Sequence, residues 1–499
     1  MADQVGERTY GNWRLPRSAG LWGLGLLGTG VLMGGIVVTI ITVATVGVIA
    51  AVGVLVALAV GLGSLMVRDR HGNTGLELIG VRVGWWRARS AGSHLYRSGP
   101  LGRTPWGTCQ LPGLLAQSRL SESRDSWGRP FAIVELPSVA HFSVVFASEP
   151  EGASLVDQEQ IDIWVARWGE WLSSLGDEPG LIAAAVTVES APDTGHRLAQ
   201  LVEAKIDPGA PALAQSVLRE VVDSAPVGSA SIRLWVALTF TATGHGRRRA
   251  AEEFARDLAA RLPGLGQRLQ GTGAGGARPV CAQELCEVVR GCYDPQASRT
   301  IEEAYAHGVT PRLRWSDVGP AAAEASGGSY RHDGASSVSW MMSAAPRGEV
   351  HSSILWKLLA PHREIARKRV TLVYRVLDPG LAARVVEADK RNADFRVNSA
   401  TRPSEHSLRE QRSALSTAQE EARGAGLIDF GVIVTATVEG DARSALSEVE
   451  ATVENLAATA RLTLRRVYGS QDSAFAACLP LGLVLARHLK LPQEIRSAL

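Results

Sequence analysis

The longest uncharged stretch of the chain runs from Ala19 to Val67 and holds 49 residues without an acidic or basic side chain. A helix rises about 1.5 Å per residue and the hydrocarbon core of a bilayer is about 30 Å thick, so about 20 apolar residues cross it once. The stretch is too long for one crossing and long enough for two with a tight turn. It therefore predicts a transmembrane helical hairpin at residues 19–67, preceded by a tail at residues 1–18.

Basic residues flank this stretch on both sides, with Arg14 and Arg17 before it and Arg68 and Arg70 after it. Because arginine near the ends of a span stays in the cytoplasm, we expect two spans with both termini and the bulk of the chain cytoplasmic. A signal peptide is the rival interpretation, but its apolar core of about 7–15 residues is much shorter than this run. The rarity of lysine, five of 52 basic residues, is typical of GC-rich bacterial genomes and places the hairpin in a bacterial inner membrane.

Small residues recur inside the uncharged stretch. Gly30 and Gly34 stand four residues apart, a spacing that lets membrane helices pack closely or self-associate into a homo-oligomer. The run Gly23–Gly28 matches the dinucleotide-binding pattern GxGxxG, which requires a strand before it and an amphipathic helix after it. Here it lies within the apolar run, so we expect helix packing and no nucleotide cofactor.

Periodic patterns return after a Gly-, Arg- and Trp-rich segment at residues 68–125, which we interpret as a basic juxtamembrane segment. Alternating apolar residues predict strands, and apolar residues three and four apart predict helices, in the order strand, helix, strand, helix, strand. This order occurs twice and favours an α+β fold of ferredoxin-like, or split βαβ, units that suggest a duplication. The predicted divisions are a first α+β domain at 126–265, a linker and helical insert at 266–350, and a second α+β domain at 351–499.

Charge is uneven along the chain although its net value is only +2. Residues 1–110 carry ten arginines and four acids, and the remainder is net acidic. The basic half suits anionic lipid headgroups as a partner. No basic patch interleaved with aromatic residues occurs in the later part, so we expect no direct contact with nucleic acid.

Cysteine spacing and motif searches point away from catalysis. The five cysteines form no CxxC pair and suit neither a disulfide framework nor a zinc site, so we expect no metal. Walker A, HExxH, GxSxG and EF-hand patterns are absent from the sequence, and the glycine-rich run Gly271–Gly276 lacks the Lys-Ser or Lys-Thr of a phosphate loop. We therefore predict no catalytic or cofactor-binding residues and no enzyme; a membrane-tethered enzyme whose site only the tertiary structure assembles stays an alternative.

A resemblance appears towards the C-terminus. The segment Phe430–Val438, the helical stripe that reaches Leu456, and the segment Tyr468–Gly482 resemble the end of the N-terminal, non-motor domain of conjugation and type IV secretion ATPases. In that family a long strand and a helix precede a glutamine, and an aromatic residue leads into a Leu-Pro-x-Gly turn. The resemblance implies that one group of residues forms either a motor-docking site or a structural turn: Tyr468, Gln471, Phe475, Leu479, Pro480 and Gly482.

The whole chain is also similar to an actinobacterial membrane-protein family that accompanies conjugation-like secretion genes, through pieces such as His94–Gly102, Val156–Gln158 and Leu479–Leu483. The resemblance implies a non-catalytic inner-membrane subunit of a conjugation or type IV-like secretion apparatus. Such a subunit would act as a scaffold that anchors or docks a separate motor ATPase beside other membrane subunits. The alternative is a type VII secretion membrane subunit, since those also combine two N-terminal spans with a cytoplasmic α+β domain.

Overall fold

The computed structural model describes most of the chain. The described residues are 8–11, 13, 25–66, 75–99, 102, 104, 108–152, 156–192, 202–203, 205–224, 230–244, 247–248, 250–346, 348–377, 379–399, 402, 404–424, 426–440 and 443–489. Much of the predicted tail at 1–18 and the first residues of the predicted hairpin, 19–24, lie outside this set.

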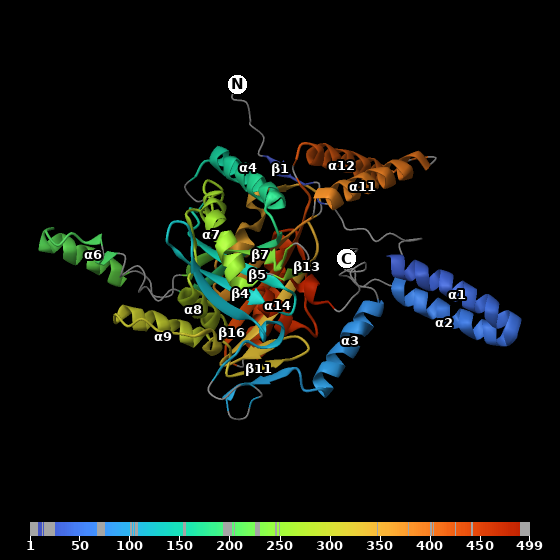
Figure 1. Ribbon diagram of the computed structural model, residues 1–499, viewed down its shortest axis with the longest axis horizontal. Coiled ribbons are helices and arrows are strands. Elements are labelled where there is room, and N and C mark those ends of the chain that lie inside the picture. The colour runs from blue at the N-terminus through green and yellow to red at the C-terminus, as the bar shows by residue number, and fades with distance from the viewer. Residues whose placement is uncertain are drawn as a thin grey trace, which may run out of the picture.

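An antiparallel sheet of 13 strands forms the centre of the described part (Figure 1). Its spatial order is β2-β11-β12-β13-β16-β15-β6-β7-β5-β4-β3, with β10 beside β5 and β17 beside β13. The strands are β2 (Leu95–Arg97), β3 (Arg119–Arg124), β4 (Pro130–Leu136), β5 (His141–Ser148), β6 (Leu181–Pro192), β7 (Ala230–Thr241), β10 (Ala277–Pro279), β11 (Ala322–Ala325), β12 (Tyr330–His332), β13 (Ala335–Ala344), β15 (Arg367–Val376), β16 (Ile428–Glu439) and β17 (Thr463–Arg466).

Helices cover both faces of this sheet or project away from it. They are α1 (Gly25–Thr45), α2 (Val48–Met66), α3 (Gly75–Ser90), α4 (Gln158–Ser174), α6 (Ala212–Ser224), α7 (Ala251–Gln267), α8 (Ala282–Tyr293), α9 (Pro295–Ala306), α10 (Trp356–Leu359), α11 (Pro379–Ser399), α12 (Glu405–Ala422), α13 (Arg443–Thr459) and α14 (Gln471–Ala477). Two short ribbons complete the strands, β1 (Thr9–Tyr10) with β14 (Val350–His351) and β8 (Thr243–Gly244) with β9 (Arg247–Arg248).

One order of elements occurs twice in the chain. Apart from the inserted elements α6, β8, β9, β14, α11 and α12, the first copy runs β3-β4-β5-α4-β6-β7-α7-β10, and the second runs β11-β12-β13-α10-β15-β16-α13-β17. Within the copies the neighbouring strands are β10-β5-β7-β6 and β17-β13-β16-β15, so the same split β-α-β arrangement appears in both. Strands β6 and β15 pair antiparallel and join the copies edge to edge, which makes one continuous sheet of the two halves.

Each copy buries one apolar face of the sheet under its own helices. In the first copy, Phe142 and Phe240 of the sheet pack against Phe254 of α7, with ring centroids 4.6 and 5.5 Å apart. In the second copy, Val434 of β16 and Val453 of α13 belong to a separate buried cluster. The strict alternation of apolar residues along β7 and β16 produces these faces, because successive side chains of a strand point to opposite sides.

The opposite face is shared by both copies and carries polar side chains at its centre. Four hydroxyl pairs are buried there among the described residues, each joining residues directly opposite on neighbouring strands. Ser337 and Thr437, at 2.7 Å, form the pair beside His332. The other three pairs are Ser143 with Thr239 at 3.2 Å, Thr187 with Thr371 at 3.0 Å, and Ser339 with Thr435 at 2.8 Å. We call these six residues the hydroxyl layer. The middle pair lies on the β6–β15 junction, and the outer pairs occupy equivalent β5–β7 and β13–β16 positions in the two copies.

The predicted transmembrane hairpin requires a correction. Helices α1 and α2 lie side by side, with Gly35 of α1 against the Leu58 side chain of α2. A bilayer crossing requires a helix that is both long enough and apolar enough, and none among the described residues meets this requirement. The two-span prediction for residues 19–67 is therefore wrong, and so is the inner-membrane localisation built on it. The structure is α+β with a large antiparallel sheet.

The central hydroxyl pair gives a first test. Changing Thr371 to Val leaves the buried Thr187 hydroxyl without this partner, so we expect a loss of about 1–3 kcal/mol in the free energy of unfolding. Denaturant titration of the full chain measures this loss.

The double variant Thr187→Val/Thr371→Val is expected to lose less than the sum of the two single variants, because neither hydroxyl is then left unsatisfied. Thr300→Val, at an exposed position of α9, serves as the control. Additive losses in the double variant would contradict the pairing.

Candidate functional site

The C-terminal segment from Gln471 to Leu483 runs through the interior of the shared face. Gln471 is fully buried, and its side-chain carbonyl accepts a hydrogen bond from the Ser339 amide at 2.8 Å. Its Nε2 donates to the carbonyl oxygens of Ser339 and Val467 at 3.1 and 2.7 Å. The Gln471 side chain thereby bonds to both backbone groups of Ser339 in β13, as a neighbouring strand would.

Phe475 continues this segment into an aromatic cluster. Its ring centroid lies 5.0 Å from that of Tyr293, 5.2 Å from that of Tyr330 and 4.6 Å from that of His332. The guanidinium of Arg369 lies 4.8 Å from the Phe475 centroid, within cation–π range. Phe475 therefore contacts both α8 and the second copy of the repeat.

Leu479, Pro480 and Gly482 turn the segment onto the first copy. All three are buried, and Gly482 adopts a left-handed conformation with φ +67°. Its carbonyl accepts the Thr239 hydroxyl at 2.7 Å. A Cβ on Gly482 would lie 2.3 Å from Thr239 Oγ1, so this position has no room for a side chain. The segment thus contacts the hydroxyl layer in both copies.

The remaining predicted site residues are exposed. Tyr468 is 59% exposed, and the Arg466 guanidinium lies 5.6 Å from its ring centroid. Gly30 and Gly34 lie in α1 with open space where a Cβ would stand. Of the six predicted docking or turn residues, Tyr468 alone is exposed to a partner in this conformation.

A buried charge cluster was missed by sequence reasoning. Glu189 of β6 and Arg369 of β15 are register partners, and Glu189 Oε1 lies 3.5 Å from Nη1 of Arg369 and of Arg367. Arg367 Nη1 also donates to the carbonyl of Gly291 at 2.6 Å. The sequence signal that could have revealed this cluster is the basic run Arg367–Arg369 at the start of β15. Because side chains alternate along a strand, Arg367 and Arg369 point to the same face of the sheet.

Lys368 lies between these arginines and points to the opposite face. Its Nζ donates to the carbonyl of Ala360 at 2.7 Å, and burial lowers the pKa of Lys368 to about 8. Desolvation disfavours the charged ammonium, and the single carbonyl compensates only in part.

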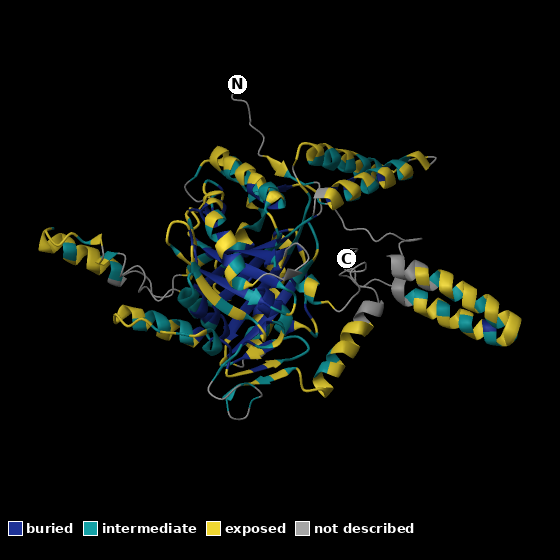
Figure 2. Cartoon of the chain, viewed as in Figure 1, coloured by how far each residue is buried: buried dark blue, intermediate teal, exposed yellow. Residues whose placement is uncertain are grey.

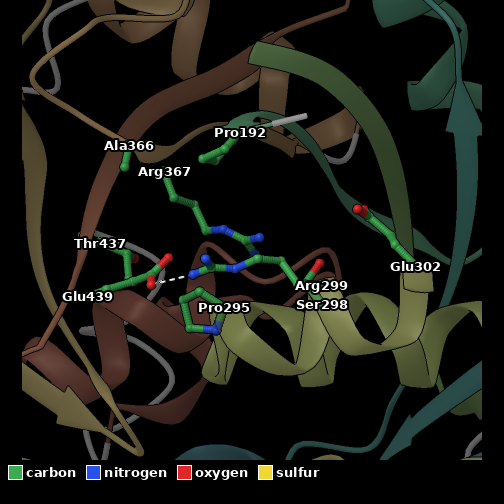
Figure 3. A pocket seen from close by; sticks show the side chains of 9 residues that line it. All are labelled: Pro192, Pro295, Ser298, Arg299, Glu302, Ala366, Arg367, Thr437 and Glu439. Carbon is green, nitrogen blue, oxygen red and sulfur yellow. Dashed lines mark hydrogen bonds and ion pairs between the residues drawn. The ribbon is translucent and has the colours of Figure 1, made fainter. Parts of the chain in front are cut away.

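A cleft of about 970 Å³ opens above the buried charge cluster. It lies between strands β7 and β10 and helices α8 and α9, and both Glu189 and Arg367 line it. A smaller pocket of about 90 Å³ adjoins it and shares Ser298, Glu302 and Arg367. Figure 3 shows this pocket, in which Arg367 reaches towards α9 and Arg299 is joined to Glu439.

The neighbouring cysteines are held as neutral thiols. Burial raises the pKa of Cys292 to about 11 and that of Cys286 to about 12, so neither is a thiolate near neutral pH. No group of three or more His, Cys, Asp or Glu side chains suited to a metal ion occurs in the described ranges. Cys286 and Cys292 are therefore weak nucleophiles near neutral pH.

Two comparisons with known proteins bear on this chain. A model of a domain of unknown function, DUF8461, matches residues 17–77. The match covers a small part of the chain and lies outside the cleft. No curated protein matches, and neither comparison supports a secretion or conjugation role.

Gly482 provides a second test. Gly482→Ala adds a methyl group against Thr239 at a left-handed position, so we expect it to lower the free energy of unfolding markedly. Gly440→Ala is the matched control, because Gly440 has φ +79° and open space around its Cβ position. We expect Gly482→Ala to cost about 1–3 kcal/mol more than the control in denaturant titrations. Equal losses would show that the turn is not packed on the sheet.

His332 gives a third test, through pH. The carbonyl of Tyr293 accepts a hydrogen bond from Nδ1 and Nε2 pairs with the Ser337 hydroxyl, and burial lowers the pKa of His332 to about 3. The unfolded chain, with an ordinary histidine pKa near 6.5, binds the proton first as pH falls. Stability is therefore full above about pH 6.5 and declines below it, by about 2 kcal/mol at pH 5 from this residue.

His332→Gln removes this contribution, so the variant should lose less stability than the wild type between pH 7 and pH 5. Burial and the positive charges of Arg487 and His488 also lower the pKa of His141, to about 4, so part of the acid sensitivity stays. His307→Gln, at an exposed position, is the control. An unchanged slope in His332→Gln would contradict the assignment.

Proposed function

We propose that this chain is a non-catalytic docking subunit that binds a separate motor ATPase of the conjugation or type IV-like class. Support for the ATPase class comes from the resemblance of Phe430–Val438 and Tyr468–Gly482 to the non-motor domain of those enzymes. Support for a docking role comes from helices that project from the sheet with exposed apolar side chains.

Helix α6 carries the observation on which the docking role rests. Leu213, Val217 and Val221 recur every four residues and form one stripe, in which Leu213 is 75% and Val221 60% exposed. Monomeric proteins rarely expose such a stripe, and an amphipathic helix commonly docks by laying it in a partner's groove. Figure 2 shows α6 standing clear of the buried core.

The two projecting helical insertions occupy equivalent places in the repeat. Helix α6 lies between β6 and β7, and the α11–α12 hairpin lies between β15 and β16. Because β6 and β15 are antiparallel neighbours, the insertions leave the sheet at opposite ends, as Figure 1 shows. Phe395 of α11 is 72% exposed. Such a subunit offers two separated contact surfaces on one rigid sheet.

The α6 stripe provides the test of this function. We expect Leu213→Asp/Val217→Asp/Val221→Asp to abolish recovery of a motor ATPase when the tagged chain is purified from its native cells after mild crosslinking. Quantitative mass spectrometry measures the ATPase relative to the bait. Charged side chains cannot enter an apolar groove without a large desolvation cost.

The control is Gln215→Asp/Arg219→Asp on the face of α6 opposite the stripe, which changes the net charge by the same three negative units. It should retain the ATPase. Recovery of a type VII motor in place of a type IV-like one would favour that alternative. Absence of any ATPase from the wild-type sample, or equal recovery with the stripe variant, would reject the proposal.

A further inference from the structure

The cleft above the buried charge cluster exposes an unpaired strand edge. Strand β7 pairs with β6 from Ala230 onward, but its pairing with β5 begins only at Leu234, opposite Ser148. After Ser148 the chain that follows β5 turns away from β7, and the backbone N–H of Glu151 donates to the carbonyl of Gly273 instead. Within the described part, residues 230–233 of β7 therefore pair on one side alone, and residues 231–235 line the cleft.

Buried polar atoms at the floor of the cleft lack hydrogen-bond partners. Among the described residues, Glu189 Oε1 and Arg367 Nε have none, although both residues are at least nine-tenths buried. The 3.5 Å contacts of Glu189 with the two arginines are ion pairs that are too long for good hydrogen bonds. An unsatisfied buried donor or acceptor costs about 1–3 kcal/mol, so the floor favours a ligand that satisfies both.

A peptide group fits this floor better than a simple ion. A peptide group carries both a donor and an acceptor and no net charge, so it suits a floor that holds both Glu189 and Arg367, whereas an anion is repelled by Glu189 and a cation by Arg367. An extended peptide also presents the backbone groups that the free edge of β7 requires for strand addition. The two observations are independent and select the same chemistry.

Charge on the cleft wall indicates the sequence of the peptide. The lining carries five glutamates against three arginines, so it is acidic overall. Glu287 of α8 is one of these glutamates, and it accepts a hydrogen bond from the Tyr305 hydroxyl at 2.6 Å. A basic side chain on the bound segment would balance this surplus.

We propose that the cleft binds an extended peptide segment of a partner protein, which adds as a strand to residues 230–233 of β7 and presents a basic side chain to Glu287 of α8. The site is separate from the α6 stripe and does not rest on the motor-docking proposal. It is a recognition site for a tail or linker of the partner, since a folded domain would not enter between β7 and α9.

The test uses the full chain and three fluorescein-labelled, acetylated nonapeptides. The first repeats Val-Lys-Thr, the second repeats Val-Glu-Thr, and the third is the first with alternate backbone nitrogens methylated. Fluorescence anisotropy should show that the lysine peptide binds at least about tenfold more tightly than the other two. Hydrogen exchange should show new protection at residues 230–235 with the lysine peptide.

Two charge-reversal variants locate the site. Glu287→Arg should weaken the lysine peptide about tenfold, while Glu303→Arg on the exposed face of α9 should leave it within about twofold. Thermal unfolding of each variant verifies the fold, and the methylated peptide tests the wild type if Glu287→Arg does not fold. The proposal would be overturned by equal binding of all three peptides or by no binding at millimolar peptide. It would also be overturned if protection of residues 230–235 rose with protein concentration alone, which would identify a second copy of the chain as the occupant.

Discussion

The register of the joined sheet depends on the hydroxyl pairs that it buries on the shared face. Ser143, Thr187, Ser339 and their threonine partners lie where a β-sheet normally carries apolar side chains. Each hydroxyl forms its hydrogen bond with the residue directly opposite on the neighbouring strand. The hydrogen bonds therefore form only in the observed strand register. A one-residue slip would bring apolar side chains to this face and leave the hydroxyls against the helices, which makes the register of the joined copies strongly specified.

The C-terminal segment belongs to this arrangement. Gln471 bonds to the β13 backbone in one copy and Gly482 to Thr239 in the other, so a single short segment connects both. Phe475 between them places an apolar ring against the Arg369 guanidinium. The residues that resemble a docking turn, apart from the exposed Tyr468, thus act in this conformation as part of the core. The two proposals above therefore place partner contacts on the exposed insertions and in the cleft.

Sequence patterns predicted the elements better than their assembly. Alternation located β7 and β16, because one face of each is apolar. The predicted linker and helical insert at 266–350 contains β13, whose Ser337 and Ser339 face the polar side of the sheet. Glu189 and Arg369 lie far apart in sequence, so only the β6–β15 pairing brings them together. The transmembrane hairpin, which was predicted from the uncharged composition of residues 19–67, was wrong. The cleft had no signal in the sequence, because it forms where β5 ends before β7 does.

The central claim is that the C-terminal segment and both sheet copies form one cooperative unit. Native-state hydrogen exchange measured by mass spectrometry tests it most directly. The account predicts that amides of residues 471–484 exchange only through the global opening that also exposes β7 and β16, with the same dependence on denaturant. Fast exchange of residues 471–484 at low denaturant, while β7 and β16 stay protected, would contradict it.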